Sequence, residues 1–204
     1  MPELIPPLLS GLTIGFLVGL TGVGGGALMT PLLILGFNTP PIVAISTDLL
    51  FATITKLSVI AVHERQASID WTATRTVWAG SIPGVVVGVA LLTFIGEVSF
   101  DYLSLFLAFV LVLTAGTMLI SIDFFLSKRA RIPVSVVGGA FIGFSVATTS
   151  LGSGALGMAI FRSLIGSDRA KNLVGTDIMH AIPITLIAGT AYFSNGWVDF
   201  QLLL

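Results

Sequence analysis

The sequence contains no cysteine and few charged residues. Of its 204 residues, 9% are charged, whereas a soluble domain carries about 25%. The missing cysteines exclude disulfides, thiol catalysis and thiolate metal sites. The two histidines and the scattered carboxylates show no metal-ligand spacing, and a net charge of −1 offers no basic face to nucleic acid. We therefore expect no metal, no cofactor and no nucleic-acid partner.

The residues that are present are mainly apolar. Hydrophobic residues make up 55% of the chain, and the mean hydropathy is +1.05. So little polar material cannot cover a water-facing surface, and the apolar runs do not alternate with the period of two that a β-barrel requires. The sequence predicts an all-α polytopic membrane protein that crosses the lipid bilayer of the cell membrane several times.

Glycines interrupt the apolar pattern at two related places. Residues 15–36 form an apolar run that is broken around Gly24, Gly25 and Gly26. Residues 143–158 form a looser copy, broken at Gly152, Ser153 and Gly154. Glycines weaken a helix and expose backbone groups, which in hydrocarbon must be covered by protein or face water. A glycine-broken apolar segment that recurs in a second half is typical of the binding site of a repeat-built transporter.

The copy continues after the glycines. The Ser46-Thr47-Asp48 segment aligns with the Gly175-Thr176-Asp177 segment of the second half. The same offset along the chain places the connector at 67–71 on the connector at 196–200. Separate matches in the same order indicate an internal duplication.

The duplication divides the chain into two repeats and a loop. We predict a first repeat over 1–126, a cytoplasmic basic loop over 127–132 and a second repeat over 133–204. The first repeat has a hairpin at 4–36 and spans at about 42–63, 76–95 and 102–126, and the second has a hairpin at 133–165 and a span at about 172–194. The second repeat lacks counterparts of the last two spans, so we expect it to be incomplete.

Loop charges predict the topology. The SKRAR segment at 127–131 is the strongest basic cluster, so the positive-inside rule assigns it to the cytoplasm. The GSDRAK segment at 166–171 has two basic residues and one acidic residue, so the same rule favours the cytoplasm for it. Both ends of 133–165 would then lie on the cytoplasmic side. Because this segment is much longer than one crossing needs and its glycine break is central, we expect a helix-turn-helix hairpin. The duplicated connectors fall on opposite sides, which gives the two repeats inverted topology.

One predicted span carries glycines at a helical spacing. Gly80, Gly84 and Gly88 recur at every fourth residue of the span at 76–95. Such a spacing makes one face of the helix smooth, so we expect another helix to pack closely against it.

Ordered motifs in both halves resemble the sulfite exporter TauE/SafE family of anion permeases. The matches are GVGGGALMTP at 22–31, STDLL at 46–50, IDW at 69–71, GTD at 175–177 followed by His180-Ala181, and VDF at 198–200. The resemblance implies inverted repeats, hairpins that meet near the membrane centre, and transport of sulfite or organosulfur anions. Two departures are the GSGAL sequence of the second break and Ala159 at the position that matches Pro31.

Lys56 is the charged residue that points most directly to an anion. It is predicted near mid-membrane, where a charge costs about 2.5–3.5 kcal/mol. It could serve as the counter-charge of an anion, with glycine-turn amides and helix N-termini as further donors. The alternatives are an ion pair with Asp48 or another acid, and snorkelling to an interface.

Other polar residues of the two repeats are candidates for the same site. Asp48 and Asp177 occupy equivalent positions, where they could couple protons, brace the glycine turns or cap helices. Thr47 and Thr176 offer hydroxyl groups to a substrate or to a neighbouring helix. His180, three residues after Asp177, could carry a proton or simply be a buried histidine.

These features favour a secondary transporter of a small anion, with sulfite or a sulfonate as the expected substrate. One alternative is a non-transporting membrane subunit or a truncated remnant. Another is an intramembrane serine protease with Ser153 as nucleophile and His180 as its base, although a G-x-S-G pattern is absent. The sequence leaves open whether a proton or a sodium ion is coupled and whether the protein forms a homo-oligomer.

Overall fold

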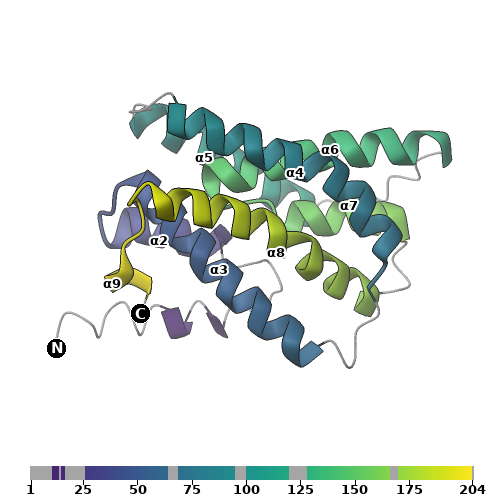
Figure 1. Ribbon diagram of the computed structural model, residues 1–204, viewed down its shortest axis with the longest axis horizontal. Helices are drawn as coiled ribbons and strands as arrows, with labels where there is room; N and C mark the ends of the chain where they lie inside the picture. Colours follow the sequence, from purple (N-terminus) through teal and green to yellow (C-terminus); the bar gives the residue numbers. More distant parts are fainter. Residues whose placement is uncertain are drawn as a thin grey trace.

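The fold is a bundle of α-helices. The computed structural model describes residues 11–13, 15–16, 26–63, 69–94, 100–119, 128–165 and 170–203, and these residues contain no strand. The helices are α2 (Gly26–Gly36), α3 (Pro41–His63), α4 (Trp71–Phe94), α5 (Phe100–Leu119), α6 (Lys128–Thr149), α7 (Ala155–Ile165), α8 (Ala170–Ser194) and α9 (Phe200–Leu203) (Figure 1). The predicted all-α class is confirmed.

The polarity of the bundle suits a lipid environment. Large apolar side chains point outward, among them Leu35, Phe94 and Val137, which are 85%, 88% and 70% exposed. Polar side chains such as Asp48 and His180 are fully buried instead. Within the described residues, four helices are long and apolar enough to cross a membrane: α3, α4, α6 and α8. A water-soluble protein rarely exposes so much apolar surface, so the predicted membrane location holds.

Most predicted spans match the helices, with two shifts. Helix α4 begins at Trp71, ahead of the predicted span, because the Asp70 carboxylate caps it by accepting the amides of Thr72 and Ala73. Helix α6 begins at Lys128, within the segment predicted as a loop, so Pro133 lies inside the helix. A membrane helix tolerates such a proline because neighbouring groups satisfy the freed carbonyl. The predicted helix over 4–22 lies largely outside the described residues.

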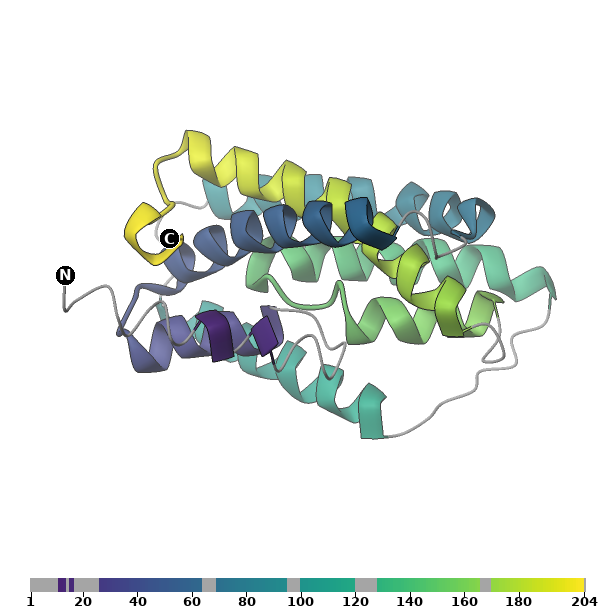
Figure 2. The same cartoon turned by 90° about the horizontal axis from the view of Figure 1, so that it is seen from below.

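Residues 133–165 form a hairpin, as the sequence predicts. Helix α6 ends at Thr149, the chain turns through 150–154, and α7 returns beside α6 (Figure 2). The turn uses two left-handed residues, Ser150 with φ 60° and Gly152 with φ 109°. Glycine adopts such a φ without strain, whereas serine does so less readily. The apolar segment therefore does not cross from end to end as one helix.

Helix starts recur at the interval predicted for the spans and connectors, which exceeds by one residue the interval at which the glycine breaks align in sequence. One and the same interval along the chain separates the first residues of α2 and α7, of α3 and α8, and of α4 and α9. Within each of the first two pairs the helices run in opposite directions through the bundle (Figure 2). This arrangement supports the duplication and is what inverted repeats require, while the sidedness in the membrane stays a prediction.

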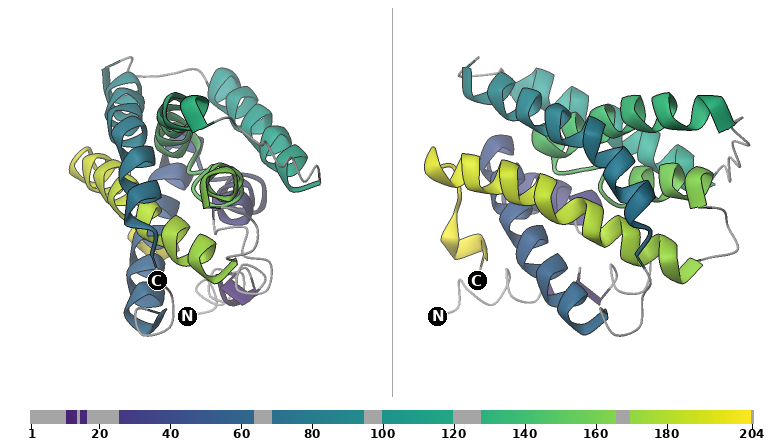
Figure 3. Two further views of the ribbon diagram at one scale, coloured as in Figure 1. Left: turned by 90° about the vertical axis from the view of Figure 1, so that its right-hand side faces the viewer. Right: turned by 45° about the vertical axis from the view of Figure 1, so that its right-hand side comes forward.

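Glycines allow α4 and α6 to approach closely, and these two helices form the largest helix-to-helix contact. A Cβ atom at Gly80 or Gly84 would collide with the α6 backbone at Val136 or Ala140. A Cβ atom at Gly88 would lie 2.7 Å from the Cβ of Ala147. The predicted packing role of the three glycines is confirmed. Helix α5, in contrast, lies at the margin of the bundle (Figure 3).

We expect Gly84→Ala to destabilise the protein by about 1–3 kcal/mol, because its methyl group would force the α4 and α6 backbones apart. Elsewhere in a helix, alanine is usually more stable than glycine. Denaturant unfolding of the purified protein in detergent micelles, followed by circular dichroism, measures the loss. Gly116→Ala on α5 is the matched control, because no atom lies within 4 Å of its added Cβ. Equal stability of the two variants would contradict the packing role.

Candidate functional site

The two glycine breaks meet in the middle of the bundle. Gly26, the first residue of α2, lies so close to the carbonyl oxygen of Ser150 that no Cβ atom would fit between them. Helices α2 and α7 both begin at this meeting point and run outward in opposite directions (Figure 2). A helix start presents unpaired amides and the positive end of the helix dipole, so two such starts favour a negative charge between them.

Lys56 reaches this meeting point from α3. Its ammonium group donates a hydrogen bond of 2.9 Å to the Ser153 hydroxyl, in the turn that precedes α7. Asp177 and Asp48 are the carboxyl groups whose charges act on Lys56, yet no carboxylate of the described residues forms an ion pair with it. Its direct partner is therefore a neutral hydroxyl, and the alternative of an ion pair with Asp48 or another acid is not found among the described residues.

Asp48 braces the start of α2. Its Oδ2 atom accepts a hydrogen bond of 2.7 Å from the Thr30 hydroxyl and lies against the Cα of Gly26. Asp48 is fully buried, and it lies well beyond the first turn of α3, so it does not cap that helix. Of the alternatives that the sequence left open, this contact favours bracing of the broken helix.

Asp177 occupies the equivalent place in the second half, but with fewer partners. Its Oδ1 atom lies against Gly157 in the first turn of α7, where a Cβ atom would collide with it. The sequence alignment places Met158 opposite Thr30 and the helix starts place Ala159 there, and neither residue carries a hydroxyl, so this half lacks the donor. The two carboxylates therefore share a position and differ in hydrogen bonding.

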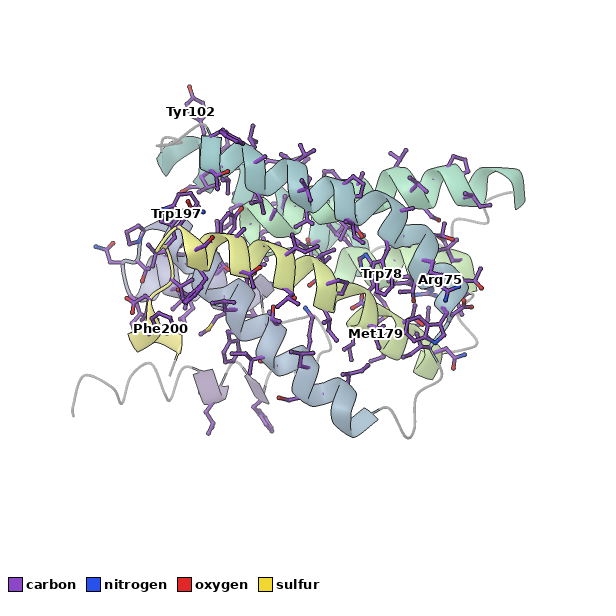
Figure 4. All side chains as sticks on the ribbon, in the orientation of Figure 1. Arg75, Trp78, Tyr102, Met179, Trp197 and Phe200 are labelled. Carbon is purple, nitrogen blue, oxygen red and sulfur yellow. The ribbon has the colours of Figure 1, made fainter. Side chains whose placement is uncertain are left out.

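Thr47 and Thr176 join the halves to each other. The Thr47 hydroxyl oxygen accepts the Asp199 amide at 3.0 Å, and the Thr176 hydroxyl oxygen accepts the Asp70 amide at 3.0 Å. Each bond thus pairs the span of one half with the connector of the other, and we call the two contacts the reciprocal bonds. They lie toward opposite ends of the bundle, as the neighbouring labels Phe200 and Arg75 indicate (Figure 4).

His180 is buried beside the site without touching Ser153. Its Nε2 atom lies 2.9 Å from the Ser81 hydroxyl, and its ring meets Phe161 edge to face at 5.3 Å. The indole of Trp78 donates to its backbone carbonyl at 3.1 Å. Ser153 instead accepts from Lys56, and no hydrogen bond joins Ser153 to His180 in the described residues, so the pair that a serine protease would use is not formed.

Several buried polar atoms near the breaks have no hydrogen-bond partner within the described residues. They include Asp48 Oδ1, Asp177 Oδ1, Ser145 Oγ and His180 Nδ1. Folded proteins rarely leave such atoms unpaired, so a concentration of them indicates a place that water or a ligand fills. In the same part of the chain, no three histidine or carboxylate side chains are close enough to hold a metal ion.

The structure brings together most of the predicted site residues. Gly26, Asp48, Lys56, Gly152, Ser153, Gly154 and Asp177 surround the meeting point, whereas Gly24 and Gly25 lie outside the described residues. Thr47, Thr176 and His180 instead contact helices and connectors nearby. Sequence reasoning missed Thr30 and Ser81, which are ordinary hydroxyl residues in apolar helices. A signal for Thr30 existed, since it stands four residues after the last glycine of the break.

Comparison with known proteins identifies the family and relatives of this chain. The family model described as "Sulfite exporter TauE/SafE" matches residues 8–204. The Bacillus subtilis protein named "Probable membrane transporter protein YjnA" is 37% identical over 96% of this chain and 81% of its own length. A second Bacillus subtilis protein, "Probable membrane transporter protein YdhB", is 29% identical over 93% of this chain and 79% of its own length. No solved structure shows a significant match.

We expect Thr30→Val to lower the free energy of unfolding by about 1–3 kcal/mol, because the change removes the donor to the buried Asp48 carboxylate while keeping the shape of the side chain. Unfolding in mixed detergent micelles measures the loss. Thr55→Val on α3 is the control, because the Thr55 hydroxyl is exposed and bonds only its own helix at Phe51. If both variants were as stable as the wild type, the bracing role of Thr30 would be refuted.

Proposed function

Since this chain belongs to the sulfite exporter TauE/SafE family, and its relatives are membrane transporters, we propose that it carries sulfite or a small sulfonate. The anion would bind where the two helix breaks meet and would cross the membrane by secondary transport. The observation that carries the proposal is the Lys56 ammonium group, which lies at this meeting point with a hydroxyl rather than a carboxylate as its direct partner.

The positive charge of Lys56 inside the bundle requires a negative group that compensates it. A lysine at this depth costs about 2.5–3.5 kcal/mol on insertion scales, and a structural lysine would offset that cost by pairing with an acid. Its bond to Ser153 leaves two ammonium hydrogens for another acceptor. An anion with several oxygen atoms, such as a sulfite or sulfonate group, could accept them together with amides at the starts of α2 and α7.

The reciprocal bonds suggest how access could alternate. Thr176 with Asp70 ties the halves at the end predicted to be cytoplasmic, and Thr47 with Asp199 ties them at the end predicted to be external. A transporter with inverted repeats opens one end while the other stays closed. We therefore assign one reciprocal bond to each gate, so that the structure with both bonds formed corresponds to a closed state.

We expect Lys56→Gln to reduce transport by about tenfold or more, which corresponds to about 1.4 kcal/mol of lost binding. Glutamine keeps the length of the side chain and removes its positive charge. Uptake of labelled sulfite into proteoliposomes measures the effect at equal protein incorporation. Ser58→Ala is the control, since it lies half a turn away on α3 with an exposed hydroxyl that bonds its own helix. Wild-type rates for the glutamine variant would exclude Lys56 from the site.

We expect Thr47→Val and Thr176→Val to open opposite ends of the protein. The natural chain has no cysteine, so a Ser145→Cys reporter beside the second break can be labelled without background. Thr176→Val should increase labelling by an impermeant thiol reagent several-fold from the cytoplasmic side, and Thr47→Val from the outside. Thr190→Val, whose exposed hydroxyl bonds only α8, should change neither. Increases on the same side for both variants would contradict the gate assignment.

A further inference from the structure

Among the described residues, three charged side chains surround the meeting point of the helix breaks, and the sum of their charges is negative. Lys56 contributes one positive charge, while Asp48 and Asp177 contribute two negative charges when both are ionised. Both carboxylates are buried, at 0% and 6% exposure. Adding an anion would leave two uncompensated negative charges in the buried centre of the bundle, where charges interact more strongly than in bulk water. One cation must therefore enter with the anion for the occupied site to be stable.

The two carboxylates are not equally suited to receive that cation. Asp48 accepts the Thr30 hydroxyl, which stabilises its ionised form. Asp177 lies against Gly157, and neither Met158 nor Ala159, the candidate counterparts of Thr30, carries a hydroxyl donor. The Oδ1 atoms of both carboxyl groups have no partner among the described residues, so the two groups differ by the Thr30 bond. The ionised form of Asp177 is thus the less stabilised of the two, and a proton is a cation that a carboxyl group can bind without further oxygen ligands.

The other titratable groups of the described residues near Asp177 are not placed to receive the proton in its stead. On α8 itself, His180 is engaged with Ser81. Arg75 lies exposed near the start of α4, and Arg162 lies in the last turn of α7, away from the break. Lys56 on α3 is the charged group whose charge acts on Asp177 within the described residues. Asp177 therefore depends on Lys56 alone for compensation, and an arriving anion competes for that same ammonium group.

We infer that the protein transports a proton together with each monovalent anion, and that Asp177 carries the proton. The inference rests on the proposed function. The proton would leave water, bind a carboxylate oxygen of Asp177, cross with the anion and return to water on the other side. The charges of the empty site, Lys56 and two carboxylates, sum to −1, and those of the loaded site also sum to −1. Transport of a monovalent anion should consequently be electroneutral.

In the Asp177→Asn variant, the inference predicts the appearance of an electric current rather than a loss of activity. Asparagine resembles the protonated carboxyl group, so the variant should still exchange isethionate, a monovalent sulfonate, in a counterflow assay. Its empty site is neutral and its loaded site carries −1, so an isethionate jump on a solid-supported membrane should give a transient current. The wild type should give none. The matched variant Asp48→Asn should also give none, since removing a fixed charge leaves its empty and loaded sites equally charged.

Measurements on wild-type protein keep the inference testable if Asp177→Asn does not fold. In proteoliposomes, a pH gradient should drive accumulation of isethionate, whereas a potassium diffusion potential set with valinomycin should not. Replacing sodium by choline should leave the rate unchanged. Accumulation driven by voltage or by sodium, or proton-driven accumulation that persists in Asp177→Asn, would overturn the inference. Absence of isethionate and sulfite counterflow in the wild type would instead refute the proposed function itself.

Discussion

The hydrocarbon core of a bilayer offers no water to open backbone groups, and this constraint shapes the whole protein. A helix that breaks at membrane depth must have its bare amides and carbonyls covered by other parts of the protein. Here the described edge of the first break lies on the second break, since Gly26 is packed directly against the carbonyl of Ser150. The helices that begin at the breaks pack against the long helices, α2 against α3, and α7 against α6 and α8. The same arrangement that protects the backbone creates a polar centre.

Duplication gives that centre its symmetry, and single substitutions remove part of it. Equivalent threonines make equivalent bonds to equivalent connectors. Equivalent carboxylates lie against the first turns of α2 and α7. Yet one carboxylate has a threonine donor, and the other lies against Gly157 without an equivalent hydroxyl. A symmetric frame thus allows the two halves to form one site, while a few unlike side chains give its two carboxylates different chemistry.

The sequence predicted what depends on composition and spacing. Long apolar runs, the shared offset of the duplicated spans and connectors, and the regular spacing of Gly80, Gly84 and Gly88 all follow from the printed letters. It did not predict that Asp70 would start α4 early, or that Ser81 would meet His180. Those outcomes depend on which face of an apolar helix turns inward, and a helix that is apolar on all sides carries no periodic signal for this choice.

The crossed threonine bonds have an evolutionary consequence. Each reciprocal bond takes its hydroxyl from one half and its amide from the other, so neither half can form such a bond by itself. A gene that encoded only one such half would have needed two copies of its product, inserted head up and head down, to close both ends. After fusion of the two copies into one chain, the residues of each reciprocal bond can mutate separately. In a homodimer of identical subunits, one mutation would change both bonds.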